Sequence, residues 1–255
     1  MEANKRRIKD LIMCPHCYSD LKWLEDSLQC PECNARFPIQ NGAINFIDYS
    51  LEKTWDSEFQ AEQMFNKTLT AKLYNAGKRL VNNEYKPRDH IREFMSGVRQ
   101  DSIVVELGSG NRRLRSDVIN VDIFPFPNVD LVADIKRTPF RDNTVEFAIL
   151  DTVLEHVPEP HKVTRELHRI LRPEGKVVCI TPFVFPYHGY PKHYFNFSKD
   201  GLEFLFRDFS ECKVEMNLGP IYFRNTLPLL YRVRVNSFIH FVKGLHFFLS
   251  SFSST

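Results

Sequence analysis

The chain has 255 residues, a hydrophobic content of 43%, a charged content of 26% and a formal net charge of +2 at pH 7. This length allows one sizeable core plus a small extra module, in an ordinary globular composition. The small net charge argues against nucleic acid as the main ligand. No long uncharged apolar run occurs and the basic start lacks the apolar stretch of a signal peptide, so we expect a cytoplasmic location.

Four of the six cysteines form two Cys-x-x-Cys pairs near the start of the chain, Cys14 with Cys17 and Cys30 with Cys33. Each pair presents two thiolates from a tight turn, and two pairs complete a tetrahedral Zn²⁺ site with no open coordination position. Disulfides or a redox pair are the alternative, which a reducing compartment disfavours. We predict a structural zinc ribbon over residues 1–48, with zinc supplying most of its folding free energy.

Residues 49–100 carry spaced apolar residues in a polar background, which is typical of amphipathic helices. We predict a helical connector that packs on the following domain and caps its ligand crevice. A plain helical linker is the alternative.

Residues 101–219 alternate strand and helix patterns, which predicts an α/β domain with a parallel sheet covered by helices. We expect strands at residues 103–107, 118–122, 130–133, 145–150 and 176–181, and helices at residues 159–171 and 199–207.

The first predicted strand breaks into a Gly-x-Gly turn at Gly108 and Gly110, where the backbone must bend and let a ligand approach closely. Asp122 ends the next strand and is placed to accept hydrogen bonds from ribose hydroxyls. A dinucleotide would require a third glycine where the chain has Arg113. Glu106 would repel a pyrophosphate but suits an ammonium or a sulfonium. We therefore predict S-adenosylmethionine in preference to NAD.

The glycine turn and the motifs after it resemble the class I S-adenosylmethionine-dependent methyltransferases, in the broad small-molecule branch called type 11. The resemblance covers residues 103–205 and rests on Glu106-Leu107-Gly108-Ser109-Gly110, Asn120-Val121-Asp122-Ile123, Ala133-Asp134-Ile135, Leu154-Glu155-His156-Val157 and the run from Glu166 to Gly175. It implies a Rossmann-like, doubly wound, mostly parallel sheet. Residues 37–46 are similar to the end of small zinc ribbons that occur as methyltransferase partner subunits or N-terminal extensions.

The resemblance also implies a set of cofactor-binding residues, which we carry over position by position. Gly108 and Gly110 would border the methionine part of the cofactor, with Glu106 nearby. Asp122 would hold the ribose, and Asp134 and the amide of Ile135 would read the adenine edge. Asp151 would face the amino acid or sulfonium, and His156 would lie close to the cofactor. For the acidic residues, the alternative is a helix cap or a solvated strand end.

The turn departs from the family in one respect. The family often has a further glycine where this chain has Arg112, and only a short segment separates Gly110 from Asp122. The arginines at positions 112, 113 and 115 would be able to reach the cofactor carboxylate. A solvated basic turn is the alternative that we favour.

The loop after the fifth strand, residues 181–198, faces the transferable methyl group in this family. It is rich in aromatic residues and contains His188 and His193. Histidine titrates in the range that a general base requires, so His188 is the first candidate base and His193 the second. The alternative is that both only hold the loop. Related loops have Asp at position 193 and Arg at position 196, which here are His193 and Asn196.

Residues 220–255 combine four basic residues with many apolar ones and contain no acidic residue. A basic amphipathic helix of this kind would lie in an anionic membrane interface. A helix pair packed on the sheet or a dimer contact is the alternative.

We therefore expect a methyltransferase for a small-molecule or lipid-linked acceptor, such as a saccharide precursor, with S-adenosylmethionine and structural Zn²⁺ bound. An RNA methyltransferase that uses the zinc ribbon to bind RNA is the second hypothesis. Against it stand the small net charge and Asp151-Thr152-Val153-Leu154 in place of an Asn/Asp-Pro-Pro-aromatic motif. A cofactor-binding scaffold that has lost catalysis is the third.

Overall fold

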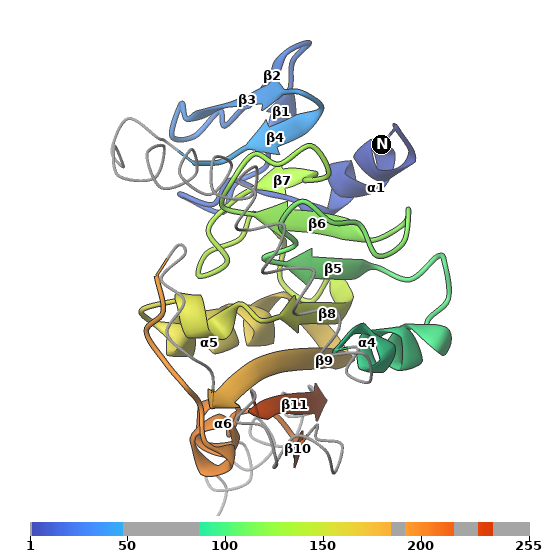
Figure 1. The fold of residues 1–255 in the computed structure, drawn as a ribbon. Coiled ribbons are helices and arrows are strands. Elements are labelled where there is room, and N and C mark those ends of the chain that lie inside the picture. Colours follow the sequence, from blue (N-terminus) through green and yellow to red (C-terminus); the bar gives the residue numbers. More distant parts are fainter. Residues whose placement is uncertain (1, 48–86, 185–191, 217–228, 237–255) are drawn as a thin grey trace, which may run out of the picture.

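The computed structural model describes residues 2–47, 87–184, 192–216 and 229–236 of the chain (Figure 1). The predicted connector up to residue 86, His188 and most of the predicted tail lie outside these residues. Among the described helices, none combines the length and the apolar character needed to span a bilayer.

Five parallel strands form the centre of one sheet, and all five expected from the sequence are present. They are β5 (Val104–Leu107), β6 (Ile119–Asp122), β7 (Leu131–Val132), β8 (Val145–Asp151) and β9 (Leu171–Val184). Their order in space is β7-β6-β5-β8-β9, as Figure 1 shows. The chain thus runs outward from β5 and then returns to its other side at β8. Ligands of such sheets bind where the order reverses, outside the carboxyl ends of the strands.

The carboxyl-terminal part of the sheet corrects the prediction for the tail. Residues 229–236, expected in a basic amphipathic helix, form strand β11 (Leu229–Asn236), which is antiparallel to β9 and to β10 (Glu211–Met216). The stretch Tyr231-Arg232-Val233-Arg234-Val235 alternates basic residues with β-branched and aromatic ones, a period of two that favours a strand. The predicted boundary at residue 220 therefore cuts through the sheet.

The N-terminal module extends the other edge of the same sheet. It consists of helix α1 (Glu2–Leu11) and strands β1 (Lys22–Trp23), β2 (Ser27–Gln29), β3 (Arg36–Gln40) and β4 (Ala43–Asn45). Strand β4 lies parallel to β7, with Ile44 opposite Leu131 and Asn45 opposite Val132. The module is therefore continuous with the main sheet (Figure 1).

Helices cover both faces of the sheet, and the alternation of side chains along β5 shows how. Val105 belongs to a core cluster with residues of α5 (Pro160–Ile170) and α6 (Lys199–Leu205), whereas Val104 belongs to a second cluster on the opposite face. That second cluster contains Ile91 and Met95 of α4 (Pro87–Ser96), a helix inside the predicted connector region.

The segment 108–144, which the structure describes in full, contains no helix between β5, β6, β7 and β8. Part of the missing cover comes from the N-terminal module, because Ile8 of α1 and Ile12 just after it join the cluster that contains Leu107 and Ile119. Ile12 also forms a bridge to Phe140. The module thus supplies this domain with both an edge strand and a covering helix.

Candidate functional site

The glycine turn after β5 packs against the turn after β8, at the point where the strand order reverses. Gly108 and Gly110 have φ of +76° and +58°, in the left-handed region that favours glycine. A Cβ on Gly108 would lie 2.5 Å from Cγ2 of Val153, so close packing excludes any side chain there. A Cβ on Gly110 would meet no atom within 4 Å. Gly110 therefore borders open space, which a ligand is able to occupy.

Asp122 connects the end of β6 to the glycine turn. Its Oδ2 accepts the N–H of Gly110 at 2.7 Å, and its Oδ1 accepts the N–H of Phe124 at 2.9 Å. Burial raises the pKa of this carboxyl group, whereas these backbone hydrogen bonds lower it. Two carboxylate oxygens have about four acceptor positions in total, so both can also receive ribose hydroxyls. The geometry fits the predicted ribose contact, which stays a prediction.

The adenine and methionine sides of the predicted site are acidic. Oδ1 of Asp134 accepts the N–H of Lys136 at 2.9 Å, so part of this carboxylate caps a turn beside Ile135. Glu106 lies within β5 with only 1% of its surface exposed. This buried carboxylate lies two residues before Gly108.

The arginines of the turn form specific contacts, which corrects the expectation of a solvated basic turn. Arg112 Nη1 lies 3.2 Å from Oδ2 of Asp151 at the end of β8. Arg113 pairs with Asp130 and donates to two backbone carbonyl groups. Arg115 pairs with Asp117. These contacts stabilise the turn, in which residues 111–118 form no helix.

Glu155 is a buried acidic residue of the site that was not among the predicted site residues. It lies in the 3-10 turn η2 (Leu154–His156) with 1% exposure. Burial raises its pKa to about 8, and the nearby charge of Asp151 adds to the shift. The Thr181 hydroxyl donates to Glu155 Oε2 at 3.3 Å. The signal that could have found it is an acidic residue four positions after the end of β8 and directly before a histidine.

The structure brings His156 and His193 together, with ring centroids 6.1 Å apart. Nδ1 of His156 lies 2.6 Å from the carbonyl oxygen of Lys192, and Nε2 of His193 lies 3.0 Å from that of Phe195. A carbonyl only accepts, so these nitrogens carry the protons. In the neutral rings, Nε2 of His156 and Nδ1 of His193 are then the basic atoms.

The four cysteines of the N-terminal module converge as predicted, with all four sulfur atoms within 4.8 Å of one another. The Cys14 and Cys33 sulfurs are 3.6 Å apart, and those of Cys17 and Cys30 are 3.4 Å apart. Tetrahedral zinc with bonds of about 2.3 Å requires sulfur separations of about 3.8 Å. Hydrogen bonds from Ser19 lower the pKa of Cys17 to about 6. The donor set fits a closed zinc site, which would have a structural role.

A cluster around Tyr18 joins this cysteine site to the loop that follows Asp134. Arg137 and Arg169 both lie over the Tyr18 ring, 5.2 and 5.8 Å from its centroid. Arg137 also donates to the carbonyl of His16 at 2.9 Å, inside the first cysteine turn. Arg137, three residues after Asp134, therefore connects the predicted adenine side to the cysteine module.

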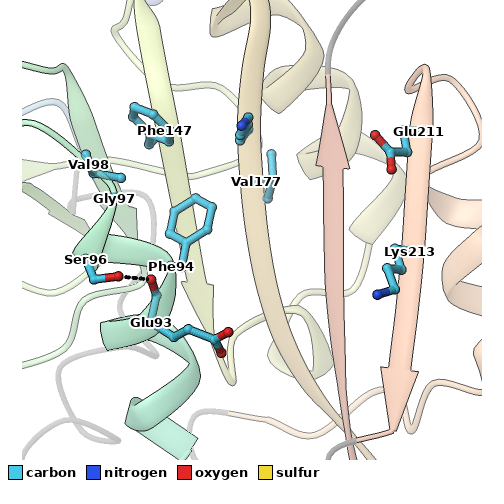
Figure 2. Close-up of a pocket in the computed structure, with 10 residues that line it drawn as sticks. Glu93, Phe94, Ser96, Gly97, Val98, Phe147, Val177, Glu211 and Lys213 are labelled. Carbon is cyan, nitrogen blue, oxygen red and sulfur yellow. Dashed lines mark hydrogen bonds between the residues drawn. The ribbon is translucent and has the colours of Figure 1, made fainter.

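A cavity of about 460 Å³ lies elsewhere, between the end of α4 and strands β8, β9 and β10 (Figure 2). Phe94 and Phe147 line it together with Glu211 and Lys213. It contains none of the residues predicted to bind the cofactor, so it is separate from the site at the carboxyl ends.

Comparisons with known proteins agree with this architecture. Residues 106–179 match the family described as methyltransferase domain, and residues 5–42 match the family described as Trm112p-like protein. A demethylmenaquinone methyltransferase of Lysinibacillus sphaericus is 33% identical over 57 residues, 22% of this chain and 24% of that protein. The ubiquinone/menaquinone biosynthesis C-methyltransferase UbiE of Rickettsia felis is 23% identical over 149 residues, 57% of this chain and 55% of that protein.

The chain thus spans only about a quarter to about a half of the length of these curated relatives. A solved structure supports the fold over a longer stretch. The 1,6-didemethyltoxoflavin-N1-methyltransferase of Burkholderia thailandensis superposes with a TM-score of 0.52 at 13% identity, covering 84% of this chain and 99% of that one. The chain therefore combines a methyltransferase domain of the class I fold with a Trm112p-like, four-cysteine N-terminal module.

Proposed function

We propose that this chain binds S-adenosylmethionine and transfers its methyl group to a small-molecule or lipid-linked acceptor. The observation that carries the proposal is the open space above Gly110, with Asp122 bonded to the same turn, at the reversal point of a class I methyltransferase sheet. Ligand binding at this point is the general rule for such sheets.

The acidic residues account for a cationic ligand. Glu106 and Asp151 are buried at the ends of adjacent strands, where carboxylates favour an ammonium or a sulfonium over a pyrophosphate. Asp122 and Asp134 stand at the ends of β6 and β7, on the ribose and adenine side.

S-adenosylmethionine would supply an electrophilic methyl carbon, and the protein's main task is then to align the acceptor and exclude water. A hydroxyl or amine acceptor must also lose a proton. His193 stands beside His156 in the loop after β9, which supports a base at this position. His188 remains the first candidate from the sequence, although it lies outside the described residues.

The class of acceptor is supported by the names of the relatives. One is named a demethylmenaquinone methyltransferase and the other a ubiquinone/menaquinone biosynthesis C-methyltransferase, and the solved structural neighbour holds 1,6-didemethyltoxoflavin together with S-adenosylhomocysteine. A ring-containing small molecule is therefore the first acceptor class to test.

The test is titration calorimetry with S-adenosylhomocysteine, followed by methyl transfer from labelled S-adenosylmethionine to separate small-molecule, lipid and RNA fractions of a cell extract. Asp122→Asn should weaken binding about tenfold or more, since it removes a charged acceptor from the ribose. Asp208→Asn, at an exposed position of the same domain, should bind like wild type. Wild-type protein that binds neither cofactor form contradicts the proposal, and binding without transfer to any fraction indicates a scaffold.

A further inference from the structure

We infer that Arg112 binds the carboxylate of the cofactor's methionine moiety, with Asp151 and Asn120 holding the arginine in position. The inference rests on the proposed cofactor binding and deepens it, because it assigns the anionic end of that ligand to one residue of this chain.

Two of the three arginines of the turn are fully engaged in contacts with the loop. Arg113 lies with Nη2 2.6 Å from the carbonyl oxygen of Asn128 and 3.0 Å from Oδ2 of Asp130, and Nη1 donates to a third group. Arg115 donates to both oxygens of Asp117 and to two further carbonyl groups. Both guanidinium groups are therefore committed to the loop itself, which leaves Arg112.

The Arg112 guanidinium lies between the turn after β5 and the end of β8. Its Nη1 is 3.2 Å from Asp151, which ends β8, so the side chain spans from the β5 turn to the neighbouring strand. The Arg112 side chain is 39% exposed, whereas that of Asp151 is 6% exposed. A guanidinium carries five N–H donors in a planar fork. It can therefore keep Asp151 on one side and present donors to a ligand carboxylate on the other.

The backbone of Arg112 is held by a hydrogen bond from Asn120. The side-chain amide of Asn120 donates from Nδ2 to the carbonyl oxygen of Arg112 at 2.5 Å. Asn120 lies within β6 and is fully buried. The backbone of residue 112 is thus fixed to the central sheet, which a positioned ligand contact requires and a merely solvated arginine does not.

The turn after β5 lacks the helix N-terminus that binds an anionic group in many nucleotide-binding folds. In many nucleotide-binding folds, the helix that follows a glycine turn supplies N–H groups and a positive dipole end to an anionic ligand. Residues 111–118, all described, form no helix after Gly110. Glu106 and Asp151 make this part of the site acidic. A ligand that carries both an ammonium and a carboxylate therefore requires a specific positive partner, and Arg112 stands where the family often has glycine.

The test compares two ligands that differ only in this carboxylate. Calorimetry with S-adenosylhomocysteine and with its decarboxylated analogue, S-adenosyl-3-thiopropylamine, is carried out on wild type, Arg112→Gln and Arg112→Lys. Arg165→Gln, an exposed position on α5, is the control. Arg112→Gln should weaken S-adenosylhomocysteine about ten- to a hundredfold, the range for a charged hydrogen bond, while the analogue changes less than about threefold. Arg112→Lys should recover part of the loss, because it restores the charge without the fork.

Equal losses for the two ligands would overturn the inference, since a residue that only shapes the turn acts on both alike. Unchanged binding of S-adenosylhomocysteine by Arg112→Gln would also overturn it. The midpoint of thermal unfolding, measured on every variant, separates a folding defect from a lost contact. Wild-type protein that binds neither ligand overturns the proposed function and this inference together, whereas the other two results leave the proposed function intact.

Discussion

The two halves of the proposed site are held by different kinds of contact. In the cofactor half, residues 106–134, buried side chains bind backbone groups. Oδ2 of Asp130 accepts the N–H of Asn120 at 2.8 Å and the guanidinium of Arg113 at 3.0 Å, while Asp122 holds Gly110. These contacts join segments that are close in sequence.

In the acceptor half, which we define as residues 153–155 and 192–197, most of the contacts are made to backbone carbonyl groups. Asp151 and His156, which are predicted to lie near the cofactor, stand at its border with the cofactor half. The carbonyl oxygen of Glu155 accepts the N–H groups of Tyr194 and Phe195 at 2.7 and 3.3 Å, and that of Lys192 holds His156. These contacts join segments that are far apart in sequence. The cofactor half is therefore held by contacts that are local in sequence, whereas the acceptor half depends on contacts between η2 and residues 192–197.

Loss of the metal should separate the two halves most strongly. A closed zinc site supplies on the order of 10 kcal/mol to such a module. Chelation, or Cys14→Ser, should therefore unfold the cysteine turns and release Tyr18 from Arg137 and β4 from β7. Hydrogen exchange should rise at residues 131–140 and much less at the amides of residues 194 and 195. Cys212→Ser, outside the cluster, is the control. An equal rise of hydrogen exchange in both halves would show that the metal-binding module does not support the cofactor half selectively.

Removal of Asp130 should produce the next largest effect, confined to the cofactor half. Asp130→Ala leaves Arg113 without its buried partner and Asn120 without its acceptor, at a cost of about 3 kcal/mol or more in the free energy of unfolding. Urea unfolding measures this loss. Asp130→Asn should recover part of it by keeping an acceptor, and Asp208→Ala should cost less than about 0.5 kcal/mol. A loss below 1 kcal/mol would mean that the turn is not held by this contact.

Features that depend on local sequence were predictable. The β-branched runs that became β5, β6 and β8, and the cysteine pairs, specify their structure within a few residues. The Gly-x-Gly turn is equally local, since positive φ at Gly108 and Gly110 follows from the residue type.

Features that depend on how strands and loops pair in the fold were not predictable. The partner of Arg113 is Asp130, which becomes a neighbour only when β6 and β7 pair. Residues 231–235 have the period of two that favours a strand, but no local pattern shows that this strand pairs with β9. The addition of β4 to β7 likewise requires a free sheet edge that no local pattern shows.

In the acceptor half, Glu155 should make the stability of the protein depend on pH. Because the pKa of Glu155 is raised from 4.5 to about 8, the folded state holds a proton that the unfolded state releases. Stability should therefore fall as pH rises from about 4.5 to about 8, by at most about 1.4 kcal/mol per pH unit. Glu155→Gln should remove this component. Urea unfolding should then show that the free energy of unfolding falls less between pH 5 and pH 8 for Glu155→Gln than for wild type. Glu203→Gln, an exposed control, should keep the wild-type slope, and an unchanged slope in Glu155→Gln would show that this carboxyl group is ionised in the folded protein.

The smallest effect on stability is expected from His193, although its effect on turnover should be large. His193→Gln keeps a side-chain donor for the carbonyl of Phe195, so the free energy of unfolding should change by less than about 0.5 kcal/mol. Binding of S-adenosylhomocysteine should change little, because His193 lies outside the residues that are predicted to bind the cofactor. Methyl transfer to the acceptor fraction should fall about a hundredfold or more if this ring takes the proton of the acceptor. Lys199→Ala, exposed on α6, is the matched control. Unchanged transfer by His193→Gln would assign the base to another residue, and a lost cofactor affinity would show that the two halves are not independent.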